Sequence, residues 1–336
     1  MGHPAHFHLF KNLLTNPNYH FIIVISDKDI LKDLLEQNNI SYIKISDYGS
    51  KFSFFHKFFK LILSTKKLIS IAKKHQPILF IGCLSQMAWA GKYLKIKTFF
   101  FAEDDFEYTK IQGKITYPFV DKIITAEGVN VGPFKAKQFT YPAYQKLAYL
   151  HPDWFTPSEK ADLQQKYMLK DAYFILRLVQ LSAHHDDKIS GISDHELQKI
   201  ISVLSQYGQI LISSEAKLAE KWKSFEFRPE INDMHSLMFH AKGVISDSQS
   251  MTVEAALLGT PNIRINDFKG KISILNELEK KFSLTYSYFP EEISLSQLEA
   301  FCKEDLQSWK MKRDKLLMEK QNPIPIYTYL IDSYFA

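Results

Sequence analysis

The sequence GVISDSQSMTVEAALLGTPNIRINDFKG, at residues 243–270, has the pattern of a strand, a polar turn, a helix and a second strand. The apolar run GVIS reads as a buried strand, DSQS as the turn and MTVEAALLG as the helix, with PNIRI as the next strand. Such a turn leaves backbone N–H groups of a helix N-terminus at the carboxyl edge of a sheet, where the helix dipole also favours an anion. The segment therefore predicts a phosphate-binding turn.

The polar side chains of this turn add hydrogen-bonding groups. Ser248 and Ser250 supply hydroxyl donors, and Glu254 is expected to bridge the two hydroxyls of a ribose. In the alternative interpretation, Asp247 and Ser250 only cap the helix. The residues predicted to contact a nucleotide-sugar here are Asp247, Ser248, Gln249, Ser250, Met251, Thr252 and Glu254.

The same alternation of strands and helices extends outward in both directions. Expected strands are 21–25, 42–45, 78–81, 98–101, 122–125, 173–179, 209–212, 243–246 and 262–265. Expected helices are 28–37, 52–74, 85–94, 194–205, 233–240 and 251–258. This order indicates an α/β fold with parallel sheets, in two Rossmann-like domains that face each other across a cleft.

The segment 140–157 interrupts the alternation with three prolines and no regular period, so we interpret it as the linker region. The expected domains are an N-terminal catalytic or acceptor domain at 1–145 and a C-terminal nucleotide-sugar-binding domain at 146–320. The tail at 321–336 is expected to pack back on the first domain as a helix. No strand precedes the loop and helix at GHPAHFHLFKNLL, so the first central strand either lies before Met1 or is absent from the domain.

Composition narrows the function classes. Of 336 residues, 46% are hydrophobic and 24% charged, which is typical of a globular protein, and neither a spanning segment nor a signal peptide is evident. The two cysteines, Cys83 and Cys302, suggest neither a disulfide framework nor a zinc site. A net charge of +5 permits acidic ligands without indicating nucleic acid. We expect a cytoplasmic protein.

Two further groups of candidates lie in the first domain. Gly2, His3 and His6 form a loop before a helix, and its histidines suit phosphate contact or proton transfer, or are surface residues of a helix-entry turn. Glu103 and Asp104 follow an apolar strand, where mutual repulsion among adjacent carboxylates raises a pKa and produces a general base. The alternative is a solvated acidic turn.

The second domain carries five groups of candidates, most of them at strand ends. Arg177 lies within a strand and is expected to pair with a carboxylate or a phosphate. His184 and His185 precede two aspartates and suit acid or base catalysis, while a metal site lacks further ligands at a characteristic spacing. The remaining candidates for contacts with base or sugar are Ser214, Glu215, His235, Asn266 and Asp267. The first three are equally suited to capping helices, whereas Asn266 and Asp267 are expected either to bind the sugar or to hold the Asp247 turn in place.

Residues 51–75 form a different kind of segment, with phenylalanines and leucines beside seven lysines and no acidic residue. A basic, aromatic helix of this kind can lie on an anionic membrane surface, as a lipid-linked acceptor would require. The alternative is an ordinary domain helix with one buried face and one lysine-lined face.

Several motifs resemble known families. Asp247, Ser248 and Glu254 match the Asp-Ser-Gly-Gly-x-x-x-Glu pattern of UDP-N-acetylglucosamine 2-epimerases, with Gln249 and Ser250 replacing the glycines. Glu103 lies where those enzymes carry a Glu at the start of a Glu-Ala-Gly-Leu-Arg segment, of which Gly-Leu-Arg is absent here. A closer resemblance, to the bacterial domain-of-unknown-function family 354, is carried by GHPAHFHLFKN, FAEDDFE, YPAYQKLAYLHPDWFTP, SDSQSMTVEAALLGTP and RINDFKGKISILNELEKKF. It implies a GT-B-like fold.

These observations lead to three functional hypotheses. The first is a glycosyltransferase of cell-surface polysaccharide synthesis that takes a nucleotide-sugar, UDP-linked by the resemblance, as substrate and needs neither a cofactor nor a metal. Its catalytic candidates are Glu103, Asp104, His6 and His185, and its acceptor would be a glycan or a lipid-linked sugar. The second is a nucleotide-sugar 2-epimerase or hydrolase, and the third is a binder without catalysis.

Overall fold

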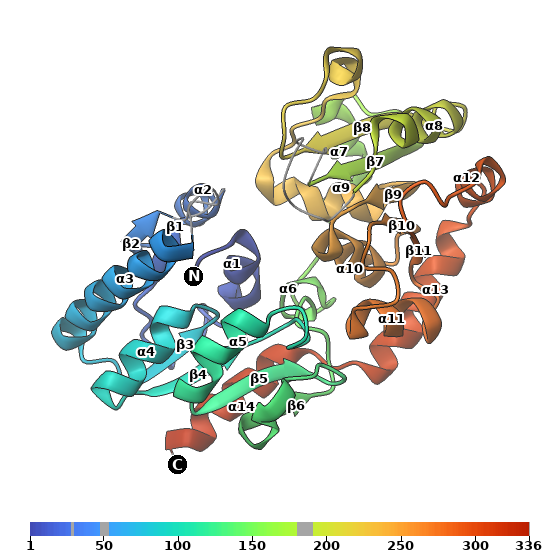
Figure 1. Ribbon diagram of the computed structural model, residues 1–336. Coiled ribbons are helices and arrows are strands. Elements are labelled where there is room, and N and C mark those ends of the chain that lie inside the picture. Colours follow the sequence, from blue (N-terminus) through green and yellow to red (C-terminus); the bar gives the residue numbers. More distant parts are fainter. Residues whose placement is uncertain (28–29, 48–53, 180–190, 336) are drawn as a thin grey trace. The chain divides into compact units, whose positions relative to one another are not determined.

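The structure is a computed structural model of the 336-residue chain and describes residues 1–27, 30–47, 54–179 and 191–335. The chain divides into two compact units, whose elements are labelled in Figure 1. The first unit comprises Met1–Tyr149 together with Asn322–Ala336, and the second comprises Leu150–Gln321. Each unit is built on parallel strands, which confirms the α/β class expected from the alternating pattern.

The second unit contains a five-stranded parallel sheet with the order β11-β10-β9-β7-β8. Its strands are β7 (Tyr173–Leu178), β8 (Gln209–Ser214), β9 (Gly243–Ser246), β10 (Asn262–Ile265) and β11 (Tyr286–Tyr288). Arg177 of β7 is in register with Ser213 of β8 and Ser246 of β9. The carboxyl ends of three neighbouring strands therefore meet at one edge.

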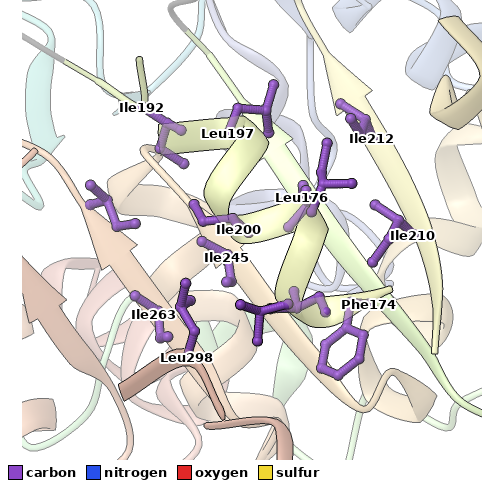
Figure 2. Close-up of a cluster of buried hydrophobic side chains, with 14 of the residues drawn as sticks. Phe174, Leu176, Ile192, Leu197, Ile200, Ile210, Ile212, Ile245, Ile263 and Leu298 are labelled. Atoms are coloured by element: carbon purple, nitrogen blue, oxygen red, sulfur yellow. The ribbon is translucent and has the colours of Figure 1, made fainter. Parts of the chain in front are cut away.

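Helices cover this sheet because its strands are apolar on both faces. They are α7 (Lys160–Tyr167), α8 (Asp194–Leu204), α9 (Met234–His240), α10 (Gln249–Leu258), α11 (Ser273–Lys280), α12 (Leu295–Cys302) and α13 (Leu306–Glu319), with 3-10 turns at Glu220–Phe225 and Ile231–Asp233. Figure 2 shows Phe174, Leu176 and Ile245 of the sheet packed with Leu197 and Ile200 of α8. All five are buried, so this face is a closed hydrophobic core.

The first unit contains two separate parallel sheets. A two-stranded sheet pairs β1 (Val24–Asp27) with β2 (Ile43–Asp47). A four-stranded sheet has the order β3-β4-β5-β6, with β3 (Leu79–Gly82), β4 (Lys97–Phe101), β5 (Lys122–Ala126) and β6 (Gln138–Tyr141). The helices of this unit are α1 (Pro4–Lys11), α2 (Leu31–Gln37), α3 (Phe54–His75), α4 (Ser85–Leu94), α5 (Lys110–Thr116), α6 (Leu147–Leu150, which ends at the first residue of the second unit) and α14 (Pro323–Phe335), with 3-10 turns at Tyr117–Phe119 and Gly132–Lys137.

Helix α14 belongs to the first unit although it is the last element of the chain. The Tyr327 hydroxyl of α14 donates to the Tyr141 hydroxyl of β6 at 2.7 Å, and the Tyr327 and Phe101 rings lie 4.8 Å apart. All three side chains are buried, so the aromatic contacts anchor α14 on the sheet.

The structure corrects parts of the predicted element map. The boundary between the two units, at Tyr149 and Leu150, falls within the segment 140–157 expected as the linker region, but the segment is ordered: β6 ends at Tyr141 and residues 143–150 are buried. The segment is rich in aromatic and aliphatic side chains, and their burial favours an ordered structure more strongly than its three prolines oppose one. The first strand begins at Val24 rather than Phe21, and strands β6 and β11 had no prediction because both are short and carry polar residues.

Within the described residues, no helix combines the length and the apolarity that crossing a bilayer requires.

Candidate functional site

The turn between β9 and α10 ends in a capped helix. Ser248 is the N-cap of α10, with an extended backbone (φ −81°, ψ 125°), and its Oγ accepts a hydrogen bond from the Met251 amide at 3.3 Å. The Thr252 hydroxyl donates to the Ser248 carbonyl at 2.7 Å. At the other end, Gly259 adopts a left-handed conformation (φ 70°) that only glycine takes without strain, and it stops the helix.

Two amides at the start of α10 remain for a ligand. The cap satisfies the amide of Met251, but in the described part of the chain the amides of Gln249 and Ser250 have no acceptor. Both residues are partly exposed, so a ligand can reach them from solvent. Orphan amides at the positive end of a helix dipole attract an anion such as phosphate.

The residues before the cap hold the turn in place. The Asp247 carboxylate accepts the Val179 amide at 2.8 Å, and the Asp247 carbonyl accepts the Asn266 side-chain amide at 2.9 Å. The Ser246 hydroxyl accepts the Ser248 amide at 2.8 Å. Strands β7, β9 and β10 therefore fix the turn together, and the structure places Asp247 and Asn266 in the role of supports.

His235 and Glu254 come together from two helices. The His235 Nε2 of α9 lies 3.6 Å from a carboxylate oxygen of Glu254 of α10, and both side chains are almost fully buried. A carboxylate at this distance restricts the orientation of the imidazole ring. The side chain assigned to ribose is thus engaged with His235, one turn behind the orphan amides.

Arg177 pairs with a carboxylate, which is one of the two kinds of partner expected for it. Its guanidinium donates to the Ser213 hydroxyl at 2.9 Å and to the Glu215 carboxylate at 2.7 Å. The Ser214 hydroxyl accepts the Ala216 amide at 3.2 Å, which closes a local turn. These residues form a polar cluster at the carboxyl ends of β7 and β8.

A buried guanidinium lies beyond β10. Arg264 is fully buried and donates to the Ser287 hydroxyl at 3.1 Å, while its Nε and Nη1 have no partner among the described residues. Burial lowers the pKa of Arg264 to about 10, which leaves it charged at neutral pH. Its Nη2 also lies 3.4 Å from the Phe268 carbonyl, in the loop that holds Asn266 and the half-exposed Asp267. The guanidinium adds positive potential behind this loop.

The acidic turn of the first unit follows β4. Glu103 forms an ion pair with Lys146, with 2.5 Å between Glu103 Oε1 and Lys146 Nζ, and the lysine side chain is only 3% exposed. The Asp105 carboxylate accepts the Asn130 amide at 2.8 Å and is buried. Two of the three carboxylates therefore serve the packing of the turn.

Asp104 differs from both neighbours because it lies at the surface. Its pKa is raised to about 6, first by the displacement of water by surrounding protein atoms and second by the charge of Glu103. The side chain touches water, yet enough solvent is excluded around it to disfavour the charged form. The raised pKa agrees with the expectation for these carboxylates, although the loss of surrounding solvent contributes more than repulsion by Glu103.

The loop at residues 2–6 is ordered by its own histidines. The His3 Nδ1 accepts the Ala5 amide at 3.2 Å, the His6 Nδ1 accepts the Gly2 amide at 3.1 Å, and the two ring centroids are 6.1 Å apart. A ring nitrogen that accepts a hydrogen bond carries no proton, so each neutral ring holds its proton on Nε2. Gly2 packs closely against Leu84, since a Cβ at this position would lie 2.6 Å from Leu84 Cδ2 and the leucine side chain would have to shift.

Some predicted residues lie outside this description, and some supporting residues were missed. His184 and His185 fall in 180–190, outside the described residues, so their pairing with the following aspartates stays a prediction. Among the described residues, no three His, Cys, Asp or Glu side chains are grouped as a metal site. Sequence reasoning missed Lys146 and Ser246; a lone lysine within the apolar run YQKLAYL was the available signal for the first.

Neither a protein-family model nor a curated protein sequence matches the chain. The likeness to domain-of-unknown-function family 354 therefore stays a resemblance of sequence motifs.

Solved structures do match over the whole chain. The MnaA protein of S. aureus, solved with UDP, is 11% identical with a TM-score of 0.67 over 100% of this chain and 95% of that one. UDP-GlcNAc 2-epimerase of Neisseria meningitidis, bound to UDP-GlcNAc, is 12% identical with a TM-score of 0.64 over 96% and 94%. The spinosyn forosaminyltransferase SpnP is 10% identical with a TM-score of 0.59 over 98% and 94%. At these identities the match concerns the fold: the chain has the α/β, GT-B-like fold that UDP-GlcNAc 2-epimerases and glycosyltransferases share.

Proposed function

We propose that this protein is an enzyme that uses a UDP-linked sugar, and that it transfers the sugar to an acceptor in cell-surface polysaccharide synthesis. The observation that carries the proposal is the start of α10, where the amides of Gln249 and Ser250 are left for an anion behind the Ser248 cap. The GT-B-like fold supports it, since proteins of this fold have been solved with UDP and with UDP-GlcNAc.

The second unit would bind the nucleotide. The orphan amides and the dipole of α10 would hold the diphosphate, with the Ser250 hydroxyl as a further donor. His235 and Glu254 form a paired imidazole and carboxylate suited to hydroxyl groups of the ribose or sugar. Polar contacts to the base would come from Arg177, Ser214 and Glu215. His184 lies outside the described residues, so its contact with the base stays a prediction.

The first unit would supply the base. Asp104 has a raised pKa near 6, so at neutral pH it is an ionised carboxylate that accepts a proton more readily than an ordinary aspartate. It would take the proton of the acceptor hydroxyl as the acceptor oxygen bonds to the anomeric carbon. The bond from that carbon to the diphosphate breaks, and the nucleoside diphosphate leaves with the electron pair. The amides of α10 would stabilise the charge that develops on it.

Glu103, His3 and His6 would assist this step. Glu103 and Lys146 form a pair beside Asp104, and the charge of Glu103 raises the pKa of Asp104 while that of Lys146 lowers it. His3 and His6, which order the loop through their Nδ1 atoms, are the proposed contacts to a phosphate or a sugar. His185 is the remaining catalytic candidate of the second unit.

A second function, epimerisation at C2 of a UDP-N-acetylhexosamine, is favoured by the fold shared with several 2-epimerases. It would use the acidic turn to remove the C2 proton and would need no acceptor. A non-catalytic nucleotide-sugar binder is the third possibility.

Calorimetric titration with UDP-, GDP-, CMP- and dTDP-linked sugars and with the free nucleotides tests the binding site. We expect UDP and UDP-sugars to bind; if none of these compounds binds, the proposal is wrong. Incubation in deuterated water then separates the reactions. Transfer leaves C2 of the bound sugar undeuterated, whereas epimerisation introduces deuterium there.

We also propose that the protein is cytoplasmic and contacts the membrane surface through α3. Phe58, Phe59 and Leu63 are 46%, 61% and 44% exposed on this helix, and Lys66 is exposed beside them. Exposed aromatic side chains next to lysines suit an anionic lipid surface, where a lipid-linked acceptor would lie.

A further inference from the structure

Arg264 is a fully buried cation that its surroundings satisfy only in part. Alternation along β10 places Ile263 and Ile265 in the core with α8, so the Arg264 side chain extends from the opposite face of the sheet. Its Nη2 donates to the Ser287 hydroxyl at 3.1 Å, whereas Nε and Nη1 have no acceptor among the described residues. The N–H groups of these two nitrogens are therefore buried without a partner.

The charge of Arg264 also lacks a partner at close range. In the described part of the chain no carboxylate forms an ion pair with it, and Glu279 of α11 acts on it only from farther away. The Glu279 Oε1 instead accepts the Ser287 amide at 3.0 Å. Taking a guanidinium out of water costs free energy that a paired anion normally offsets, and fully buried arginines are almost always paired. Arg264 thus lacks a negative group beside Nε and Nη1.

The first turn of α11 adds further buried donors. Its N-cap, Ile272, has no side-chain acceptor for the helix amides. Among the residues that the structure describes, the amides of Ile274 and Leu275 have no acceptor, and both residues are almost fully buried. Orphan amides at the positive end of a helix dipole favour a negative charge.

One turn of the chain connects Arg264 with the start of α11. The Phe268 carbonyl accepts the Lys271 amide at 3.1 Å and Arg264 Nη2 at 3.4 Å. The Asn276 side-chain amide of α11 donates to the Gly270 carbonyl at 2.9 Å. This turn therefore lies against both the guanidinium and the beginning of α11, and it brings the two sets of orphan donors into one region.

We propose that one small monovalent anion, with chloride as its simplest form, binds between Arg264 and the first turn of α11. The donors there are N–H groups of a guanidinium and of the backbone, which are the groups that bind anions in proteins. A water molecule would accept hydrogen bonds from them but would leave the charge of Arg264 unbalanced. The charge of Glu279 disfavours a second negative charge, so a divalent anion fits less well.

The bound anion would stabilise the loop that supports the turn before α10. The Phe268 amide donates to the Asn266 side-chain oxygen at 3.0 Å, and the Asn266 side-chain amide donates to the Asp247 carbonyl at 2.9 Å. An anion that neutralises Arg264 would hold the same loop from below, since the Phe268 carbonyl contacts the guanidinium.

The test records the midpoint of thermal unfolding of the full chain while sodium gluconate, whose bulky anion a buried site excludes, is replaced by chloride or bromide at constant ionic strength. We expect the midpoint to rise and then level off, by about 5–10 °C at a halide concentration about 100 times the Kd. Arg264→Met should show no saturable rise. Arg313→Met is the matched control and should respond like the unmodified protein, because this partly buried arginine already donates from Nε to the Leu257 carbonyl.

An equal halide response in Arg264→Met and the unmodified protein, or no saturable response in the unmodified protein, would overturn the proposal. Crystals of the unmodified protein soaked in bromide make the test independent of how the variant folds. We expect an anomalous peak within hydrogen-bonding distance of Arg264 Nε or Nη1. Ordered water at this position without such a peak would show that the donors are only hydrated, and the proposal would be wrong.

Discussion

The turn after β9 and the turn after β4 are built alike and carry opposite chemistry. Each follows a buried parallel strand, and each leads toward a helix. After β9, the cap by Ser248 leaves backbone donors exposed at the positive end of α10. After β4, the three consecutive carboxylates at 103–105 provide acceptors and negative charge.

The comparison shows how the surroundings of a turn decide its use. The Asp247 carboxylate is engaged in holding the turn after β9, so the groups that remain for a ligand are the backbone amides of Gln249 and Ser250. After β4, Glu103 is paired with Lys146 and Asp105 accepts the Asn130 amide. Asp104 is therefore the carboxylate that remains at the surface of this turn. In both turns the groups that remain, rather than the full set of polar residues, indicate the function.

The largest expected effect comes from the acidic turn. Asp104→Asn should lower the turnover of the UDP-sugar by about 10²- to 10⁴-fold, because the amide cannot accept the proton of the acceptor. Steady-state kinetics measures the loss, and calorimetry should show UDP binding unchanged. Glu107→Gln, an exposed carboxylate close by, is the control and should keep its activity. Full activity of Asp104→Asn would remove Asp104 as the base.

The next effect concerns the turn after β9. Gln249→Pro removes one orphan amide at the first position of α10, where proline fits a helix. A lost hydrogen bond to a charged group is worth about 1.5–3 kcal/mol, so the Kd for UDP should rise about 10- to 100-fold.

Leu295→Pro provides the matched control for this variant. Leu295 is the exposed first residue of α12, behind the Ser294 cap. We expect this variant to bind UDP normally and both variants to keep their thermal midpoints. Unchanged UDP binding by Gln249→Pro would place the diphosphate elsewhere.

The pH dependence of the rate tests the role of Asp104 in the acidic turn. Only the ionised form of Asp104 is a base, so with a pKa of about 6 the rate should fall about tenfold per pH unit below this value. Lys146 lowers the pKa of Asp104, so Lys146→Met should move the midpoint of the profile to higher pH. A profile whose midpoint is unmoved by this change would assign the titration to another group.

The same shift of the Asp104 pKa affects stability with a definite sign. Its pKa is raised from 3.8 to about 6, so the folded state binds the proton more tightly than the unfolded state. The contribution of Asp104 to stability therefore falls as pH rises between these values and is constant above them. Urea unfolding of the protein and of Asp104→Asn across pH 4–7 measures this difference.

The smallest expected effect concerns α3. Phe59→Ser should weaken binding to vesicles that contain phosphatidylserine about fivefold, through the apolar surface it removes. Met318→Ser, which alters an 86% exposed residue of α13, is the control and should bind like the unmodified protein. Equal binding by all three proteins in co-sedimentation would contradict the membrane contact.

Much of the fold could be predicted because its signals are local. The strands at 243–246 and 262–265 and the helix at 85–94 have the predicted bounds, since each is an apolar run bordered by turn residues. Strands β6 and β11 were missed because short strands with polar residues gain their stability from neighbours that lie far away in the chain.

The α/β class and the chemical character of the two turns follow from local sequence, because the period of apolar residues and the identity of turn residues act over a few positions. Which groups of each turn are engaged depends on contacts that form only in the folded chain. Lys146 reaches Glu103 across 43 residues and Val179 reaches Asp247 across 68, and such partners are selected by packing rather than by spacing.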